Sequence, residues 1–470
     1  MESFDLVVVG AGPGGYPAAI RAAQLGASVA LVEQEELGGT CLNWGCIPTK
    51  TLIASSNFYF EMKNAAELGL RSDGVSFDYG ELVARKDQVV KKLRAGVSQL
   101  LKANGVAVLK GTASFRSRQL LTVRENASEK LVEARKVILA TGSVSARPDF
   151  LPVHPRVVDS KGFLNLTSLP SSAIVLGGGI IGCEFACMLA QFGVQTTLVE
   201  LLPDIIATLD DDVRRELRRQ MEKRLGIRII TGVSLEDIRA DDSEVHARIG
   251  EEAIRADLLL AALGRRPATK GLALENAGLY PADGGFLKVD DFGRTRAASI
   301  FAVGDLTGSM QLAHLATSQG IVAAENACGQ HLRRNEKTVP ACIFTSPEIG
   351  VVGLSEKEAA QQGIEVRIGK FPFSVLGKAL ASGHATGFVK WIADPGTGQL
   401  LGAQAIGPHA TELIAEAAVL VRGEATARDL AQTIHAHPTL SEAWMEAAHV
   451  LTGEPIHSAP PSRKTIRERV

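Results

Sequence analysis

The fold is decided by the stretch FDLVVVGAGPGGYPAAIRAAQLGASVALVE at residues 4–33. It predicts an apolar strand, a glycine-rich turn, an alanine-rich helix and a second strand that ends at Glu33. The glycines let the backbone turn tightly and approach a pyrophosphate at the helix start, and an acid about 20 residues further on accepts from a ribose hydroxyl. The alternative is an ordinary glycine turn, but the strand, the helix and the acid in register favour a dinucleotide-binding βαβ unit.

The same pattern occurs again at residues 173–200. A displacement of 167 positions carries the marker residues of the first copy onto those of the second without a gap: Gly10, Gly12, Gly15, Gln24, Gly26 and Glu33 become Gly177, Gly179, Gly182, Gln191, Gly193 and Glu200. A repeat of this size indicates two domains built on one plan. We therefore expect an α/β protein with two nucleotide-binding units.

Between the two copies, the stretch GGTCLNWGCIPTK at residues 38–50 carries Cys41 and Cys46. Five residues of regular helix rise by about 7.5 Å, which exceeds the Cα separation of roughly 4.4–6.8 Å across a disulfide. A bond here therefore requires an irregular turn, which Gly45 allows. Pro48 suits the first turn of a helix, so Cys46 would lie at a helix start that stabilises a thiolate. The alternative is a pair of buried free thiols.

Composition narrows the class of protein further. A chain of 470 residues is too long for one core, and its 50 Lys and Arg nearly cancel its 52 Asp and Glu. This balance argues against nucleic acid or an anionic membrane surface as a partner. The apolar run Leu6–Val9 is too short for a signal peptide or a membrane span. Only six cysteines favour a reducing compartment, the cytoplasm, with one pair kept for function.

The rest of the chain predicts more elements of both kinds. Residues 60–101 predict helices with charged faces, and similar buried strands at 137–143 and 258–267 each close one nucleotide unit. Another strand ends at Asp305 and precedes a helix at about 310–328. From about residue 339 the pattern becomes α+β, which predicts a third unit.

The remaining cysteines show no pairing signal. Cys183 and Cys187 lie four apart on the helix after the second glycine turn, on a face that must pack against the sheet. We expect both to be core residues, and we treat Cys328 and Cys342 as packing residues as well.

A further motif, HAHPTLSE at residues 435–442, separates His437 from Glu442 by five positions around a proline. The carboxylate suits an orienting role for the imidazole. It also completes a capping box with Thr439 at the start of the last helix. Both roles are compatible if one carboxylate oxygen reaches the histidine.

Together, the cysteine motif, the two glycine motifs and the histidine motif closely resemble the dihydrolipoamide dehydrogenases, in the pyridine nucleotide-disulfide oxidoreductase family. The resemblance runs to about residue 453. It implies an α/β fold with two Rossmann-like dinucleotide-binding domains, for FAD and NAD, and a C-terminal α+β dimerisation domain. The implied bounds are 1–147 for the FAD domain, 148–271 for the NAD domain, 272–342 for a central segment returning to the FAD domain, 343–457 for the dimerisation domain and 458–470 for a flexible tail.

The resemblance also implies roles for single residues. Cys41 would exchange with substrate, Cys46 would face the flavin, Lys50 and Glu184 would flank it, and His437 would be a base oriented by Glu442. FAD would be held by Gly10, Gly12, Gly14, Gly15, Glu33, Gly39, Thr40, Lys50, Thr141, Gly142, Asp305, Met310 and Ala313. NAD would be held by Gly177, Gly179, Ile181, Gly182, Glu200 and Gly264. No metal is implied. Because no arginine occurs at 201–204, Glu200 predicts NAD and not NADP.

The activity implied is oxidation of dihydrolipoamide with reduction of NAD. The implied partners are a second copy of the chain and a lipoyl-bearing protein of a 2-oxo acid dehydrogenase complex or the glycine cleavage system, with no nucleic acid and no membrane. The alternatives are a reductase for another disulfide or for a quinone, a subunit that merely holds FAD, and a redox-signalling binder. Cys41, Cys46 and His437 argue against the last two.

Overall fold

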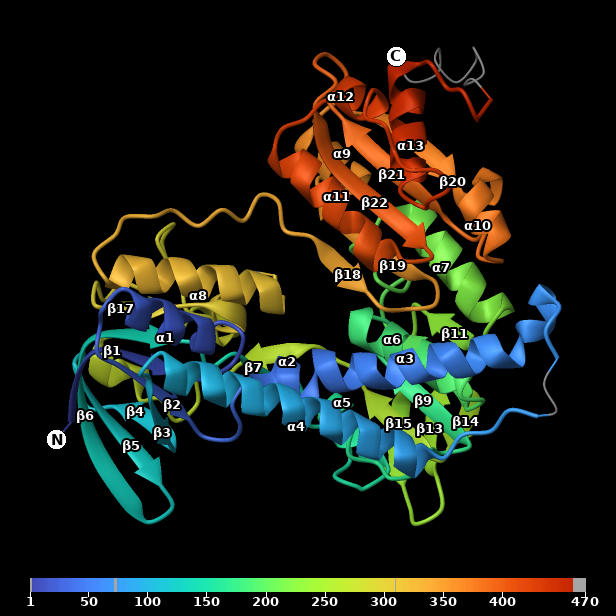
Figure 1. Cartoon of the computed structure of the whole chain (residues 1–470). Helices are drawn as coiled ribbons and strands as arrows, with labels where there is room; N and C mark the ends of the chain where they lie inside the picture. The colour runs from blue at the N-terminus through green and yellow to red at the C-terminus, as the bar shows by residue number, and fades with distance from the viewer. Residues whose placement is uncertain (1, 72–73, 309, 460–470) are drawn as a thin grey trace.

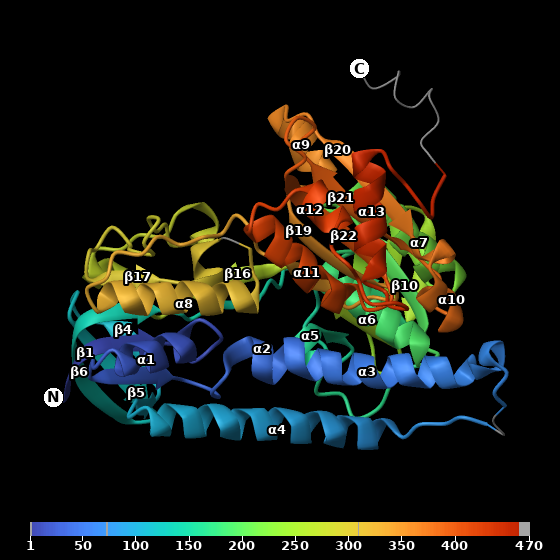
Figure 2. The same cartoon turned by 45° about the horizontal axis from the view of Figure 1, so that its top comes forward.

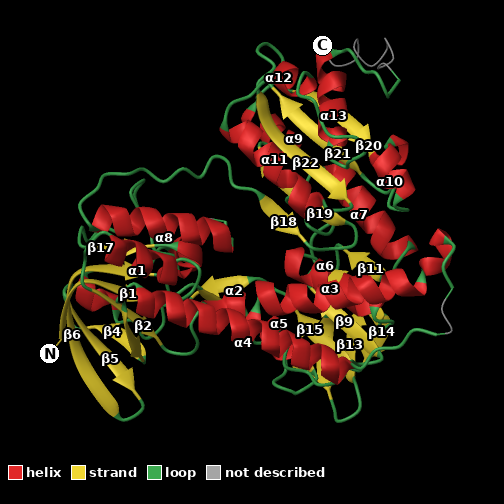
Figure 3. Cartoon of the chain, in the orientation of Figure 1, coloured by secondary structure: helices red, strands yellow, loops and turns green. Residues whose placement is uncertain are grey.

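The computed structural model describes residues 2–71, 74–308 and 310–459. In these ranges the chain forms three bodies, each built around its own sheet (Figures 1 and 3). We call them the first, second and third unit in the order in which the chain first enters them. The predicted flexible tail falls mainly on residues 460–470, which lie outside the described residues.

The first unit has a sheet in the order β3-β2-β1-β6-β5-β4, with β17 beside β6. The strands β1, β2, β3, β6 and β17 pair in parallel, while β4 and β5 extend the sheet antiparallel. Residues 6–9 of β1 are buried, because both faces of the parallel part are covered. Leu6 and Val8 belong to a core that includes helix residues on one face, whereas Val7 and Val9 belong to a core that includes β4 and β5 on the other. The elements are β1 (Glu2–Val9), α1 (Gly15–Gln24), β2 (Val29–Glu33), β3 (Ala107–Lys110), β4 (Thr112–Phe115), β5 (Leu120–Glu125), β6 (Ser128–Leu139), β17 (Ile300–Ala302), η4 (Gly304–Thr307) and α8 (Ala313–Ala327).

Long helices connect the first unit to the second. Figures 1 and 2 show α3 and α4 running side by side between these units. The expected helical region at 60–101 is interrupted, because α3 ends at Lys63 and the next long helix starts only after Asp78, whose carboxylate accepts the N–H of Glu81. The elements are α2 (Gly39–Trp44), α3 (Cys46–Lys63), η1 (Ala65–Leu68) and α4 (Tyr79–Ala103).

The second unit repeats the parallel plan in the order β11-β10-β9-β15-β8 and adds an antiparallel sheet, β12-β13-β14. Cys183 and Cys187 lie in α6 and are buried in the core, as predicted. The elements are β8 (Val157–Val158), α5 (Ser160–Phe163), β9 (Ser172–Leu176), α6 (Ile180–Gln191), β10 (Gln195–Glu200), α7 (Asp211–Lys223), β11 (Arg228–Thr231), β12 (Glu236–Ala240), β13 (Val245–Ile249), β14 (Glu252–Ala256) and β15 (Leu258–Ala261).

A small antiparallel pair links the two nucleotide units, since β7 follows the first sheet and β16 follows the second. The chain then returns to the first unit to supply β17 and α8. The prediction for Cys328 is wrong: the side chain is exposed just after α8, where the helix has already left the core. The connecting elements are β7 (Ser143–Ser145), β16 (Arg265–Pro267), η2 (Leu274–Ala277) and η3 (Asp283–Gly285).

The third unit is an antiparallel sheet, β18-β19-β22-β21-β20, packed against helices. Its core contains the rings of Trp391 and Trp444, whose centroids are 4.8 Å apart and whose planes are tilted by 52°, and Cys342 packs at its edge. The elements are β18 (Ala341–Ile343), β19 (Glu348–Gly353), α9 (Glu356–Gln362), β20 (Arg367–Pro372), η5 (Phe373–Val375), α10 (Gly377–Ala381), β21 (Phe388–Ala393), β22 (Leu400–Gly407), α11 (Ala410–Arg422), α12 (Ala427–Ala431) and α13 (Glu442–Thr452).

A buried lysine joins the third unit to the second. Lys390 on β21 is fully buried, and its Nζ lies 2.9 Å from Asp210, 2.9 Å from Asp212 and 2.8 Å from Glu356. The Asp210 carboxylate also accepts the N–H groups of Glu356 and Lys357, so it caps α9 from the second unit. No helix in the described ranges is long and apolar enough to cross a membrane.

Candidate active site

The two glycine turns share one hydrogen-bond pattern. Glu33 Oε2 accepts the Ala11 N–H at 2.8 Å, and Glu200 Oε2 accepts the Gly178 N–H at 2.5 Å. The other oxygen of each carboxylate accepts an N–H two residues further on, from Glu35 at 2.8 Å and from Leu202 at 2.7 Å. Each acid therefore fixes its own turn.

Each turn has one position that is too close to neighbouring backbone for any residue except glycine. A Cβ on Gly15 would overlap the carbonyl oxygen of Gly10, and a Cβ on Gly182 would overlap that of Gly177. No side chain in the described residues caps the start of α1 or α6, so each helix start can donate N–H groups to a phosphate. The residues present therefore fit a dinucleotide at each turn.

Other candidates for the first nucleotide surround the first turn. A Cβ on Gly39, at the start of α2, would lie 2.6 Å from Gly12 Cα, so these two backbones touch. Gly14 packs against Val303 and Ala316. Thr40 lies in α2, Gly142 follows Thr141, whose hydroxyl donates to Ala268 O at 2.8 Å, Met310 is exposed, and Ala313 begins α8.

Asp305 lies in η4 where three segments meet. Its Oδ2 accepts from Ser143 Oγ at 2.5 Å and lies 3.9 Å from Arg265 Nε. Arg265 also donates to the Ser143 hydroxyl at 2.6 Å. Ser143 and Arg265 were not predicted from the sequence, because they come close to Asp305 only when β7 pairs with β16. Of the candidates for the second nucleotide, Ile181 lies in α6 and Gly264 precedes β16.

The two motif cysteines form a disulfide, Cys41–Cys46, with Cα atoms 4.7 Å apart. Cys41 lies in α2, and Cys46 is the first residue of α3. Gly45 separates the helices with φ −137° and ψ −110°, which supplies the irregular turn that the spacing requires. The disulfide therefore lies at the start of an 18-residue helix, and α2, which carries Cys41, begins in contact with the first glycine turn.

Lys50 and Glu184 connect α3 with α6. Lys50 Nζ donates to both oxygens of Glu184, at 2.9 and 2.8 Å, and the carboxylate is buried. One of these oxygens also accepts the N–H of Phe344, whose ring lies under the ammonium at 4.7 Å. This ion pair, one turn along α3 from Cys46, joins segments of all three units.

Trp44 lies between the cysteines in sequence, and its ring contacts a cation. Lys161 Nζ, in α5, is 3.9 Å from the ring centroid and 3.0 Å from a carboxylate oxygen of Glu35. The segment between the two cysteines therefore contacts the second unit through a cation–π interaction.

His437 and Glu442 are paired as expected. His437 Nδ1 lies 2.8 Å from Glu442 Oε1, while Oε2 accepts the Thr439 N–H at 2.7 Å. Burial alone would raise the pKa of Glu442, but these hydrogen bonds hold it below its ordinary value. The capping box is only half formed, because the Thr439 hydroxyl donates to Ala436 O and Ser441 is the residue before the helix.

Within one chain the disulfide and the histidine lie in different units. Cys41 is in α2, whereas His437 is in the loop between α12 and α13 of the third unit, and Figures 1 and 2 show these elements well apart. The His437 side chain is 77% exposed. Its neighbour His435 is instead mostly buried and paired with Glu416 at 2.8 Å, a contact that the sequence did not signal.

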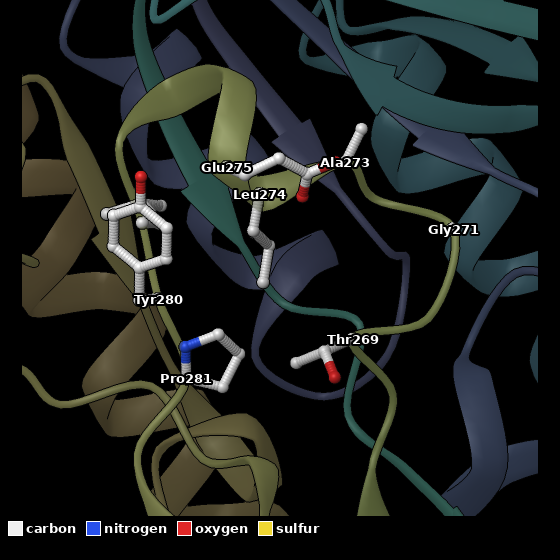
Figure 4. A pocket seen from close by; sticks show the side chains of 8 residues that line it. Thr269, Gly271, Ala273, Leu274, Glu275, Tyr280 and Pro281 are labelled. Carbon is white, nitrogen blue, oxygen red and sulfur yellow. The ribbon is translucent and has the colours of Figure 1, made fainter.

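A separate pocket lies along the segment that leads from β16 back to the first unit (Figure 4). Its lining contains no cysteine or histidine and consists of Thr269, Gly271, Ala273, Leu274, Glu275, Leu279, Tyr280 and Pro281. Among the described residues, no group of three His, Cys, Asp or Glu side chains could hold a metal ion.

Comparison with known families matches residues 4–320 to the pyridine nucleotide-disulphide oxidoreductases and residues 339–448 to the dimerisation domain of the same family. The chain belongs to this family. It is 44% identical over 464 residues to the dihydrolipoyl dehydrogenase of Haloferax volcanii, covering 97% of each chain. It is 41% identical over 462 residues to that of Chlamydia pneumoniae, covering 98% of this chain and all of the relative. For Bacillus subtilis the identity is 40% over 460 residues.

Solved structures show the same architecture. LpdA from Mycobacterium tuberculosis superposes with a TM-score of 0.89 at 28% identity, covering 96% of this chain and 99% of that one. The copper complex of RclA, a flavoprotein disulfide reductase of Escherichia coli induced by HOCl, gives 0.87 at 29% identity, covering 95% of this chain and 99% of that one.

Proposed function

We propose that this chain is a dihydrolipoyl dehydrogenase, which oxidises dihydrolipoyl groups and reduces NAD with FAD as bound cofactor. The observation that carries the proposal is the Cys41–Cys46 disulfide at the start of α3, beside the first glycine turn. Relatives of that name at 40–44% identity over nearly the whole chain support it. When bound, FAD accepts the electron pair of the reduced thiols and NAD receives it as hydride.

His437 supplies the base for the first step. An ionised carboxylate only accepts hydrogen bonds, so Glu442 fixes the proton on His437 Nδ1 and leaves Nε2 free to accept one. Nε2 would then take the proton of a substrate thiol, giving the thiolate that attacks disulfides.

Thiol exchange then proceeds in two balanced steps. The substrate thiolate attacks Cys41 Sγ, a new S–S bond forms, the Cys41–Cys46 bond breaks, and Cys46 leaves as thiolate. The second substrate thiol loses its proton and attacks the substrate sulfur of the mixed disulfide, so Cys41 leaves as a thiolate that takes up a proton. The substrate has then lost two electrons and two protons and is a cyclic disulfide, while the cysteine pair holds the electrons. The start of α3 favours the Cys46 thiolate.

The residue roles and domain bounds expected from the sequence form part of the proposal. The first turn, with Gly39, Thr40, Lys50, Thr141, Gly142, Asp305, Met310 and Ala313, would hold FAD, and the second, with Ile181 and Gly264, would hold NAD. The FAD domain would comprise 1–147 with 272–342, the NAD domain 148–271 and the dimerisation domain 343–457. The low cysteine content supports a place in the cytoplasm.

A direct test adds dihydrolipoamide without oxygen to the FAD-loaded protein and counts thiols. We expect two new thiols, at Cys41 and Cys46, with one lipoamide released for each pair. A Cys41→Ser variant should release none. If glutathione or a quinol reduced the pair faster than dihydrolipoamide, the substrate assignment would be wrong.

We further propose that each active site combines two chains of a homodimer, since the histidine of one chain lies away from its own disulfide. The third unit matches the family's dimerisation domain, and a two-fold axis there would bring His437 to the disulfide of the partner. The lipoyl group would arrive on a separate protein of a 2-oxo acid dehydrogenase complex or of the glycine cleavage system.

Mixed dimers test the shared site. Homodimers of Cys41→Ser and of His437→Gln should each be severely impaired. A hybrid of the two, made with differently tagged chains, has one site with both residues intact if sites are shared, and it should recover about half of the wild-type turnover with FAD retained. A hybrid no more active than its parents would place each site within a single chain.

A further inference from the structure

The loop after Glu200 is fixed at the edge of the second unit where an adenine ribose would lie. The Glu200 carboxylate accepts the N–H groups of Gly178 and Leu202. Ile206 N–H donates back to Gly178 O at 2.8 Å, and Gly232 N–H donates to Leu202 O at 2.9 Å. These bonds hold residues 201–206 against both the glycine turn and the end of β11.

Two arginines reach this loop from α7. Arg214 and Arg218 are four residues apart and therefore lie on one face of the helix. Arg214 Nη1 lies 2.7 Å from Asp204 Oδ2, and Arg218 Nη1 lies 3.2 Å from Asp204 Oδ1. The three side chains are only 16%, 30% and 20% exposed. Residues 201–204 contain no arginine, as the sequence shows, but α7 brings these two arginines to the loop from further along the chain.

Arg218 also reaches the strand beside Glu200. Its Nη1 donates to Thr231 Oγ1 at 3.3 Å, and Thr231 is the register partner of Glu200 across the β10–β11 pair. A guanidinium at this edge is the group that would recognise a 2′-phosphate. In this chain, however, its donors face Asp204, Thr231 and Glu222.

We propose that Asp204 is a specificity-determining residue that acts together with Glu200: it holds Arg214 and Arg218 on its own carboxylate, so that neither of these two arginines is free to bind the 2′-phosphate of NADP. This inference rests on the proposed function of the second unit as the NAD site. Selection against NADP then has two parts, repulsion by Glu200 and sequestration by Asp204.

Arg218 is the arginine that the loss of Asp204 would release. Arg214 remains bound to Asp211 and to Leu209 O after Asp204 is removed. Arg218 would keep only the half-exposed Glu222 on its own helix, a weak hydrogen bond to Thr231 and a contact of 3.5 Å to Ile229 O. Arg218 can therefore turn toward a phosphate placed beside Glu200.

The experiment measures binding of 5′-ADP and 2′,5′-ADP to the FAD-loaded protein by titration calorimetry. The variants are Glu200→Ser, Asp204→Asn, the double variant and the double variant with Arg218→Gln added. We expect Glu200→Ser to improve 2′,5′-ADP binding by removing repulsion, and the double variant to improve it by about a further tenfold or more through a charge-assisted contact. Adding Arg218→Gln should abolish this second gain. Glu200→Ser itself should weaken 5′-ADP binding, but among the variants that carry Glu200→Ser the 5′-ADP affinities should differ by less than about threefold.

A matched control leaves Asp204 in place. Arg218→Gln in the Glu200→Ser background should not change 2′,5′-ADP binding, because Asp204 still occupies that arginine. A double variant that binds 2′,5′-ADP no better than Glu200→Ser, or a gain that survives Arg218→Gln, would overturn the role of Asp204 while the NAD site stands. If the wild type bound neither nucleotide, the proposed function of the second unit would fail, and this inference with it.

Discussion

The two glycine turns have nearly the same local structure but different surroundings. In the first turn Gly12 touches the backbone of Gly39 in α2, and a Cβ on Gly320 of α8 would overlap the carbonyl oxygen of Gly14. In the second turn a Cβ on Gly179 would meet nothing within 4 Å, and the next residue, Ile180, is exposed. The first glycine turn is therefore enclosed by two helices, α2 and α8, whereas the second turn is open at Gly179.

On the proposed assignment of FAD to the first turn and NAD to the second, this difference would separate a resident cofactor from an exchanging one. A nucleotide held under α2 and α8 would leave only if packed backbone moved, whereas one on the open turn would leave without such a movement. The cysteines show the same contrast. The pair beside the enclosed turn is partly exposed and disulfide-bonded, while the pair after the open turn, Cys183 and Cys187, is buried and free.

The largest expected effect is in thiol reactivity. Burial raises the pKa of Cys187 to about 12 and that of Cys183 well above its ordinary value. At pH 8 a thiol of this pKa is ionised to about one part in ten thousand. After two-electron reduction, we expect iodoacetamide to label Cys41 first, and Cys183 and Cys187 at least about a thousandfold more slowly. Peptide mapping measures each rate.

The same labelling experiment tests the order within the reactive pair. Cys46 should follow Cys41, because we assign the Cys46 sulfur to the flavin side. Labelling of Cys46 before Cys41 would reverse these roles, and early labelling of Cys183 would contradict the contrast between the two pairs.

A second prediction concerns the buried ion pairs of Lys390, which hold the second unit against the third. Lys390→Met removes a fully buried cation and leaves Asp210 and Asp212 facing each other. We expect the free energy of unfolding to fall by about 3–5 kcal/mol, the usual effect of breaking a buried ion pair. Urea unfolding followed by circular dichroism measures it, and FAD content should change less than stability.

Lys370→Met is the matched control, because Lys370 pairs with the same Asp212 at 2.8 Å but is 40% exposed. Its effect should be about 1 kcal/mol or less. Burial alone would raise the pKa of Asp212, but Lys390 and Lys370 hold it below its ordinary value. Its contribution is therefore present above about pH 4 and lost as the pH falls below that, and the gap between wild type and Lys390→Met should narrow there. An equal gap at pH 3 and pH 7 would contradict the ion-pair account.

A third prediction compares an alanine substitution beside the first turn with one in the second turn. Gly320→Ala forces α8 away from Gly14, an overpacking effect of about 1–3 kcal/mol that should weaken FAD retention about 5- to 150-fold. Gly179→Ala, at φ −74°, should leave FAD in place and raise the KM for NAD about tenfold, because a methyl group then separates the backbone from the pyrophosphate. Ultrafiltration measures FAD loss. Full FAD retention in Gly320→Ala would show that α8 does not enclose the cofactor.

Local sequence signals predicted much of this molecule. The repeat of Gly10 and Glu33 at Gly177 and Glu200 predicted two units, because a tight turn restricts the residues that can form it. Gly45 predicted the break that the disulfide requires, and His437 with Glu442 predicted a pair within one short loop. In each case the interacting residues are close in sequence.

Contacts that depend on how separate elements pack against one another were missed, because no local pattern signals them. Asp204 meets Arg218 only because α7 packs back over the loop, and Lys390 meets Asp210 across 180 positions. The exposed Cys328 and the half-formed capping box at Thr439 depend on where a helix leaves the core or starts, and helix ends are set by tertiary packing more than by propensity.

The smallest predicted effect concerns the contact between Trp44, which lies between the two motif cysteines, and Lys161 of the second unit. Lys161→Met keeps the apolar stem but removes the charge above the Trp44 ring, and we expect the free energy of unfolding to fall by about 0.5–1 kcal/mol. The matched control is Lys63→Met, since Lys63 lies 5.4 Å from the Tyr59 ring, further away and over a poorer acceptor, so its effect should be smaller. Lys161 also forms an ion pair with Glu35. A double-mutant cycle with Glu35→Gln distinguishes the contribution of this ion pair from that of the Trp44 contact. The contradicting outcome would be that, in the Glu35→Gln background, Lys161→Met lowers the free energy of unfolding no more than Lys63→Met does. The second unit would then not help to hold residues 41–46 in place. The enclosed turn and its own helices would then position the disulfide alone.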